Sequence, residues 1–346
     1  GQTCIVTPHD EKFTSGSLGS AHYGMPDAYQ VSREANKTLE GSYVRSVTDV
    51  PGYSGGKIVI SYQEQLLNGW NPDIAMDQLI PNDVAGYNYG IIRGRRVPNL
   101  DLERAYVVAT EDGTVVNMAG FPAVSLSKNQ QTSFRLNGNG KDSYSLSSNK
   151  PIQVFHLSGT DASTQGQRAG GVVPPLSTEE TCIGSKVVDF SRSMDHPFNF
   201  ILNVAAFQHP TDPTLRAIGH FKLQKSVNGS LFADVTGPEL AVQNHLNNPA
   251  NWKPFPSLNA AIAKWQWLSV NTDALVSGNP DIMQVYADVA RTQIVAYRLI
   301  NTANVFQLGV LNGHGEHDAL YGYFSDFRKV EVGVQVKDNA GATISG

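Results

Sequence analysis

The clearest alternation of apolar and polar positions lies in the first half of the chain. The β-prone runs Arg104–Ala109 and Val115–Met118 flank Thr110–Thr114, whose Asp-Gly dipeptide predicts a hairpin between the two runs. Further strands are predicted at Val124–Leu126, Gln131–Leu136, Ser143–Leu146 and Ile152–Leu157, with turn-forming residues between them. This regular spacing of short strands indicates a sandwich or a jelly roll.

The same pattern resumes after a polar, Gly-rich stretch. Strands are predicted at Lys186–Phe190, Phe198–Phe207, Leu215–Leu223, Leu231–Val235, Ile282–Val289, Thr292–Ile300, Phe306–Leu311 and Lys329–Val336. Asn228-Gly229 predicts a second hairpin. Leu258–Trp267 fits a helix or a strand, and Pro280 would also suit the start of a helix over 282–289.

Few segments predict helix. Asp73–Ile80 could form two helical turns that end before Pro81, and Pro238–Leu246 has a proline near its first turn. Gly56–Tyr62 is β-branched and aromatic, which predicts an early strand. Residues 1–35 show little periodicity and are expected to be extended or loop-like.

Composition supports an all-β fold. Only 16% of the 346 residues are charged, while 32 Gly and 18 Pro suit many short strands joined by tight turns. We expect two β-sandwich-like or jelly-roll-like units with few short helices. The predicted organisation is an extended lead-in over residues 1–50, a first unit over 51–175 and a second over 176–346, with a break near the extended Val172–Leu176.

Charge and hydropathy exclude two classes of partner. The formal net charge is −5 and no basic run alternates with aromatic residues, so neither nucleic acid nor an anionic membrane is expected as a partner. No stretch approaches the roughly 18 apolar residues that a transmembrane helix needs, so no membrane span is predicted. Cys4 and Cys182 are too few for a disulfide framework; they form one long-range bridge in an oxidising compartment or remain two free thiols.

The best candidate metal ligands are His314, His317 and Asp318, with Glu316 between them. Imidazole and carboxylate groups bind zinc and related ions, but this spacing equally fits a solvated polar loop. The loops Thr110–Thr114 and Asn279–Asp281 offer oxygen ligands for a structural calcium ion, although no EF-hand spacing is present. No other cofactor is expected.

The sequence carries no recognised catalytic signature. The chain has no Gly-x-Ser-x-Gly elbow, no Walker loop and no dinucleotide fingerprint. The carboxylate pairs Asp101/Glu103 and Glu111/Asp112 could serve a glycosidase, but such pairs are also typical of exposed turns. Several aromatic residues could form either a binding surface or the core: Trp252, Trp265, Trp267, Tyr87, Tyr89, Tyr321 and Tyr323.

An ordered series of short motifs spans about residues 55–330. The motifs are Ala75–Pro81, Glu103–Val116, Ser148–Phe155, Val173–Leu176 with Cys182–Ser185, and Leu308–Asn312 with Tyr321–Asp326. In this succession the chain resembles the N-terminal domain of IgG-Fc-binding proteins, a family found in secreted or surface proteins of Bacteroidetes-like bacteria. Ala319-Leu320 stands where members of that family often have a cysteine, so a disulfide there is not implied.

The resemblance implies an exported β-rich region for adhesion or binding. The leading hypothesis is a non-enzymatic module, secreted or at the cell surface, that recognises a host glycoprotein, an immunoglobulin or a glycan. A carbohydrate-active hydrolase of β fold is the first alternative. The second is a purely structural segment that contacts only other domains of a larger surface protein.

Overall fold

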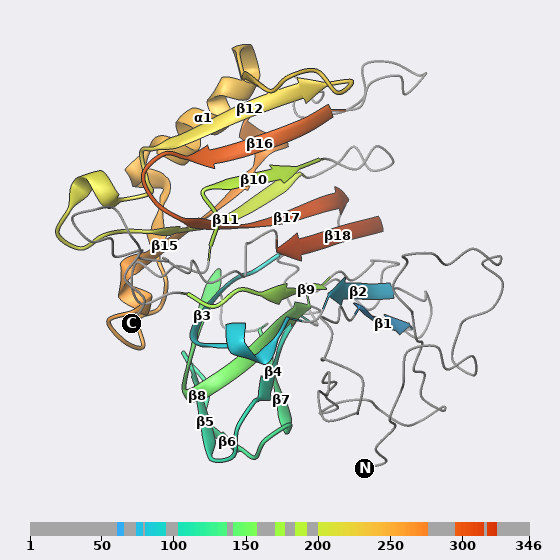
Figure 1. Cartoon of the computed structure of the whole chain (residues 1–346), viewed down its shortest axis with the longest axis vertical. Coiled ribbons are helices and arrows are strands. Elements are labelled where there is room, and N and C mark those ends of the chain that lie inside the picture. Colours follow the sequence, from blue (N-terminus) through green and yellow to red (C-terminus); the bar gives the residue numbers. More distant parts are fainter. Residues whose placement is uncertain are drawn as a thin grey trace, which may run out of the picture. The chain divides into compact units, whose positions relative to one another are not determined.

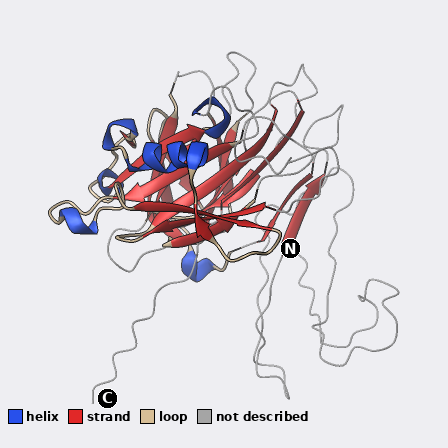
Figure 2. Cartoon of the chain, turned by 90° about the horizontal axis from the view of Figure 1, so that it is seen from above, coloured by secondary structure: helices blue, strands red, loops and turns tan. Residues whose placement is uncertain are grey.

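The computed structural model describes residues 61–65, 74–78, 80–94, 103–136, 141–157, 170–176, 184–191, 200–275, 295–314 and 317–323. All of them lie in the unit formed by residues 43–346. The described residues are mostly strands in antiparallel sheets, with a few short helices (Figures 1 and 2). The predicted all-β class is therefore confirmed, while the predicted division at residues 50 and 175 stays a prediction.

The first large sheet is built around one long strand, β8 (Ser143–Leu157). The strand order is β6-β5-β8-β4-β7, and β3 and β9 also pair with β8. Its other strands are β3 (Gly86–Ile92), β4 (Arg104–Ala109), β5 (Thr114–Met118), β6 (Val124–Leu126), β7 (Gln131–Arg135) and β9 (Gly170–Val173). Alternate side chains of these strands form one buried core, which includes Val107, Val116 and Val154.

The hairpin predicted at Thr110–Thr114 is wrong, although both flanking strands are present. β4 pairs with the C-terminal half of β8 and β5 with its N-terminal half, each antiparallel to β8. Two strands that are both antiparallel to a third run in the same direction, so β4 and β5 cannot form a hairpin with each other. The Asp-Gly segment is instead a loop between two successive strands that pair with β8. The side-chain oxygen of Asn149 in β8 accepts the Val115 N–H at 2.6 Å, and its amide donates to the Gly113 carbonyl at 3.1 Å.

A second correction concerns the two strands predicted at Ser143–Leu146 and Ile152–Leu157, which are parts of the single strand β8. Pro151 lacks an N–H donor and would normally interrupt a central strand. Here its carbonyl accepts hydrogen bonds from the Thr110 N–H at 3.3 Å and the Thr110 hydroxyl at 2.6 Å. Because the neighbouring strands are interrupted at the same point, the ladder needs no donor from Pro151.

The helix predicted at Asp73–Ile80 is also wrong. Ile74–Gln78 forms strand β2, which pairs antiparallel with β1 (Ser61–Gln65) over five positions. A helix of two turns has little stability of its own, whereas strand pairing satisfies the backbone groups of both segments. The predicted strand Gly56–Tyr62 overlaps β1 only at its end, and its earlier residues lie outside the described part of the chain.

Two further sheets form the second half. The five-stranded sheet has the order β14-β15-β11-β17-β18 and the four-stranded sheet the order β10-β16-β12-β13. The strands of the first are β11 (Ile201–Phe207), β14 (Lys253–Pro254), β15 (Trp265–Asn271), β17 (Phe306–His314) and β18 (His317–Tyr323). The strands of the second are β10 (Val187–Phe190), β12 (Phe221–Val227), β13 (Ala233–Asp234) and β16 (Val295–Asn301).

A buried core joins these two sheets, with Leu202 and Val204 of β11 packed among residues of β12 and β16. Helix α1 (Leu240–Asn247) adds Val242 and Leu246 to this core, which confirms the helix predicted at Pro238–Leu246 with a shifted start. The second helix is α2 (Thr272–Leu275). Single 3₁₀ turns occur at Asn82–Val84, Pro213–Leu215, Gly237–Glu239, Pro249–Asn251 and Ile262–Lys264.

The other predictions for the second half are mostly confirmed with shifted bounds. The Asn228-Gly229 hairpin joins β12 to β13, and both turn residues have positive φ (53° and 76°) as this two-residue turn requires. The strand predicted at Leu215–Leu223 begins later, at Phe221, because Pro213–Leu215 forms a 3₁₀ turn. The segments Ile282–Val289 and Lys329–Val336 and the lead-in lie outside the described residues.

The opposite face of the five-stranded sheet is buried too. Ala205, Phe207 and Trp267 of this face share a third core with Ile92 of β3 and Leu176, which follows β9. Two hydrogen bonds reinforce the contact: Ser145 of β8 donates to the Pro256 carbonyl at 2.5 Å and Gln307 of β17 to the Pro175 carbonyl at 2.9 Å. The first sheet and the five-stranded sheet are thus joined by a packed interface.

Candidate functional site

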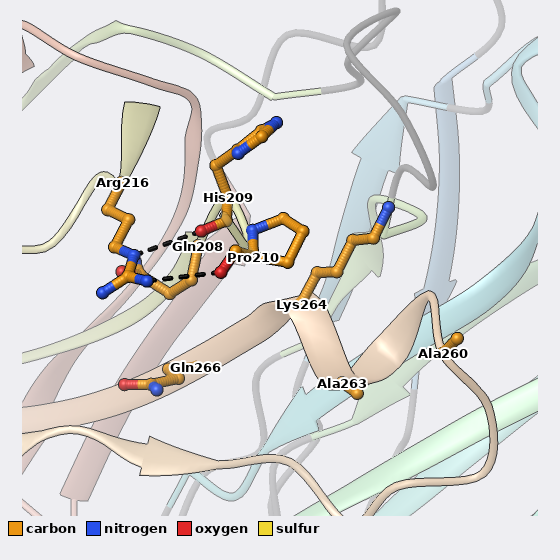
Figure 3. A pocket seen from close by; sticks show the side chains of 8 residues that line it. All are labelled: Gln208, His209, Pro210, Arg216, Ala260, Ala263, Lys264 and Gln266. Carbon is orange, nitrogen blue, oxygen red and sulfur yellow. Dashed lines mark hydrogen bonds between the residues drawn. The ribbon is translucent and has the colours of Figure 1, made fainter. Parts of the chain in front are cut away.

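A hollow of about 480 Å³ lies beside the end of β11 (Figure 3). Two segments that are distant in the sequence form its walls: 208–216, which follows β11, and 260–266, which leads into β15. The lining residues are Gln208, His209, Pro210, Arg216, Ala260, Ala263, Lys264 and Gln266. The Gln208 N–H donates to the Lys264 carbonyl at 2.7 Å, which joins the two walls.

The first wall is a compact loop held by its own polar groups. Asp212 accepts hydrogen bonds from the Thr214 N–H at 2.8 Å and the Thr214 hydroxyl at 2.7 Å, which caps the 3₁₀ turn Pro213–Leu215. Arg216 then donates from Nε to the His209 carbonyl at 3.1 Å and from Nη2 to the Pro210 carbonyl at 3.4 Å. The loop therefore fixes the guanidinium beside the hollow (Figure 3).

The second wall begins at a short turn that Asn259 stabilises. Its side-chain oxygen accepts hydrogen bonds from the N–H groups of Ala261 at 3.1 Å and Ile262 at 3.0 Å. Ile262 is completely buried in the core below, so the 3₁₀ turn Ile262–Lys264 is anchored. The next residues along the turn, Ala263 and Lys264, line the hollow.

Among the residues that the structure describes, the lining carries positive charge and no acidic side chain. Arg216 and Lys264 are cations, and His209 adds an imidazole whose Nδ1 accepts the Asp212 N–H at 2.9 Å. Asp212 lies just outside; hydrogen bonds from Thr214, and then the positive charge of Arg216, hold the pKa of its carboxyl below the usual value. Chemically, the hollow is suited to a small anion or an anionic group of a larger ligand.

A separate surface feature lies on the four-stranded sheet. Asp189, Arg298, Gln224 and Asp234 form one row across its four strands. Arg298 donates two hydrogen bonds to Asp189, at 2.7 and 2.8 Å, and its guanidinium carbon lies 4.0 Å from the centre of the Phe232 ring. Next to Phe232 in the chain, Leu231 is 93% exposed, the largest exposed fraction among the large apolar side chains of the described residues.

The predicted metal ligands lie at the end of the β17–β18 hairpin. His314 ends β17 and His317 begins β18, and their backbones are paired in register, with Asp318 next in the strand. The side chains of these residues, and all of Gly315 and Glu316, lie outside what the structure describes, so the metal site stays a prediction. Cys4 and Cys182 also lie outside the described residues, and so their bridge stays a prediction too.

The predicted carboxylate pairs have separate structural roles where they are described. Glu103 is buried, and its two oxygens bind Arg93 Nε at 2.8 Å and His156 Nε2 at 2.6 Å. Glu111 lies 3.2 Å from Lys150, and Asp112 accepts the Lys128 N–H at 2.8 Å. These contacts favour structural roles for Glu103, Glu111 and Asp112; Asp101 lies outside the described residues.

Most of the candidate aromatic residues that the structure describes are core residues. Trp252, Trp265, Trp267 and Tyr89 are buried, whereas Tyr87 is 50% exposed. The side chains of Tyr321 and Tyr323 lie outside the described part. The residues of the hollow form no motif that would predict it from the sequence; only the turn residues around Pro210 and Pro213 mark one wall.

The described fold and hollow together define an antiparallel β protein with a small cationic surface site. The model of the family described as IgGFc binding protein matches residues 22–222, more than half of the 346-residue chain. The chain belongs to this family. No curated protein and no solved structure matches the chain. Among the described residues, no helix is both long and apolar enough to cross a membrane.

Proposed function

We propose that this chain is a non-enzymatic binding module, secreted or held at the cell surface, that recognises an immunoglobulin or a related extracellular glycoprotein. The observation that carries the proposal is the family match over residues 22–222, because the family is described as IgGFc binding protein. The match covers the first large sheet and reaches β12 in the four-stranded sheet. In this proposal the module is one part of a larger surface protein.

The chemistry of the exposed sheet face supports binding to a protein. Arg and aromatic side chains contribute much of the binding free energy at protein interfaces, and Arg298 lies over Phe232 on this face. The neighbouring Leu231 exposes an apolar side chain that gains free energy when a partner covers it. Glu103, Glu111 and Asp112 each contact a structural partner. These contacts favour a binding module over a hydrolase.

The proposal is tested by the binding of the purified chain to immobilised immunoglobulin G, its Fc fragment, its Fab fragment and a mucin. Saturable binding to Fc with none to Fab is expected, and it should weaken in Leu231→Asp. The matched control is Ser125→Asp, which adds the same charge at an exposed position of β6 in the first large sheet. Absence of saturable binding to all four proteins would overturn the proposal, as would turnover of a glycan by the purified chain.

A further inference from the structure

We propose that the hollow between residues 208–216 and 260–266 binds an acidic sugar, with Arg216 as the group that contacts the sugar's carboxylate or sulfate. This inference rests on the proposed function, since it names a chemical group that the partner glycoprotein would present. The hollow is built from residues of both the matched and the unmatched part of the chain.

The charge of the hollow differs in sign from that of the whole chain. The chain has a formal net charge of −5, yet among the described residues the lining of this hollow includes the guanidinium of Arg216 and no carboxylate. Such a local reversal of sign selects anions over cations and neutral ligands. Asp212, outside the lining, offsets part of this charge but is itself engaged by Thr214.

Arg216 is held in place before a ligand binds. Its Nε and Nη2 donate to two main-chain carbonyls of the same loop, which fixes the plane of the guanidinium. These two bonds use two of its five N–H donors, and the others remain to form charge-assisted hydrogen bonds to a carboxylate or a sulfate. A donor that is already held in place loses less conformational entropy when the ligand binds.

Apolar and amide groups surround Arg216 in the hollow. Pro210, Ala260 and Ala263 give the hollow apolar surface, while Gln208 and Gln266 add side-chain amides that both donate and accept hydrogen bonds. A sugar ring presents both C–H surface and hydroxyl groups, so it matches this mixture better than an inorganic anion does. A volume of about 480 Å³ is within the range of small-molecule sites, and it has room for a single sugar unit.

The expected affinity is modest because Arg216 is exposed to water. Water and salt screen exposed charges, so binding of one sugar should fall in the millimolar range and weaken as salt is added. Useful avidity would come from several such contacts with one glycoprotein.

The test is a titration of the full chain, followed by NMR, with 3′-sialyllactose, 3′-sulfolactose and lactose. We expect both acidic sugars to bind, lactose to bind far more weakly, and Arg216→Ala to reduce the acidic-sugar affinity about tenfold, as expected for a lost charged hydrogen bond. If only one of the two acidic sugars binds, its acidic group, carboxylate or sulfate, is the group that the hollow recognises. The matched control Lys222→Ala removes an exposed cation on β12, which pairs with Asp234 at 2.9 Å, and should leave the affinity unchanged.

Arg216 also holds its own loop in place, so a second variant that keeps Arg216 is needed. Ala263→Trp leaves all charges in place and fills the hollow from the exposed 3₁₀ turn, so it should also abolish binding of the acidic sugars. The inference is overturned if no acidic sugar binds at about 10 mM, or if lactose binds as well as they do. It is also overturned if binding persists in both variants.

The two proposals fail in different ways. Fc binding by the wild-type chain without any binding of acidic sugars would sink only the assignment of the hollow. Sugar binding that Arg216→Ala removes, without binding to any glycoprotein, would support the hollow and sink the proposed function.

Discussion

The backbone of Gly90 lies directly against the ring of Phe255, so that a methyl group on Gly90 would stand 2.6 Å from the ring carbon Cζ. Gly90 belongs to β3 of the first large sheet, whereas Phe255 directly follows β14 of the five-stranded sheet. Phe255 is only 2% exposed and packs in the third core. This contact shows that the absence of a side chain at position 90 lets the two sheets approach each other.

Gly90→Ala should therefore destabilise the chain. A methyl group added to a packed interface typically costs about 1–3 kcal/mol, and truncation of a buried Phe about 3–5 kcal/mol. Phe255→Ala should remove most of the penalty of Gly90→Ala, so the double variant should be no less stable than Phe255→Ala alone. Denaturant unfolding of all four proteins measures this coupling; additive losses would show that the contact does not limit the packing.

The buried cluster around Glu103 leads to a second prediction. Glu103→Gln leaves the Arg93 guanidinium without the carboxylate that it contacts at 2.8 Å, and breaking a buried ion pair typically costs about 3–5 kcal/mol. The control is Glu111→Gln, which removes an exposed pair with Lys150 and should change the free energy of unfolding by less than about 1 kcal/mol. Equal losses in the two variants, measured by chemical denaturation, would contradict this account.

The ion pair between Asp189 and Arg298 predicts a pH effect. Hydrogen bonds from Arg298 hold the pKa of the Asp189 carboxyl below its usual value. The pair therefore stabilises the folded chain above the unfolded-state pKa, and this contribution is lost as the pH falls through the lower folded-state pKa. The effect on stability should be small because both side chains are partly exposed.

Arg298→Ala should raise the pKa of Asp189 toward the usual value for an aspartate. An NMR titration that follows the Asp189 carboxyl carbon in the wild type and in Arg298→Ala measures the shift. The comparison variant is Lys222→Ala, which removes a cation that bonds Asp234 and not Asp189. It should leave the midpoint of the Asp189 titration unchanged. An unchanged Asp189 midpoint in Arg298→Ala would show that another group lowers this pKa.

The two turn signals in the sequence show what local pattern can and cannot predict. At Asn228-Gly229 the local signal and the strand pairing agree, so β12 and β13 form the predicted hairpin. At Asp112-Gly113 the turn residues are as strong a signal, and Gly113 has a φ of 70°. There, however, the partner of both strands is β8, which lies over 20 residues further along the chain and leaves no local trace at the turn.

The same reasoning applies to β2 and to the hollow. Ile74–Gln78 is a strand because of its pairing with β1, which a window of eight residues does not contain. The hollow forms where 208–216 meets 260–266, so only the fold brings Arg216 near Ala263. By contrast, the alternation in β4 and β16 reflects burial of one face along the strand itself, which the sequence shows directly.

The Asn228-Gly229 turn supports a further prediction. Gly229 has a φ of 76°, and a non-glycine residue in this left-handed region costs roughly 1–2 kcal/mol. Gly229→Ala should lower the free energy of unfolding by about that amount, whereas Asn228→Gly, at a φ of 53°, should change it little. Thermal unfolding of both variants measures the difference; similar stability of the two would show that the turn relaxes.

The most direct test of the central claim is a calorimetric titration of the purified chain with the Fc fragment of immunoglobulin G. The account predicts a saturable isotherm with a defined stoichiometry. It also predicts that unlabelled Fc displaces labelled Fc from the chain. No heat, no saturation and no displacement at Fc concentrations of about 100 μM would contradict the proposal that this chain is an immunoglobulin-binding module.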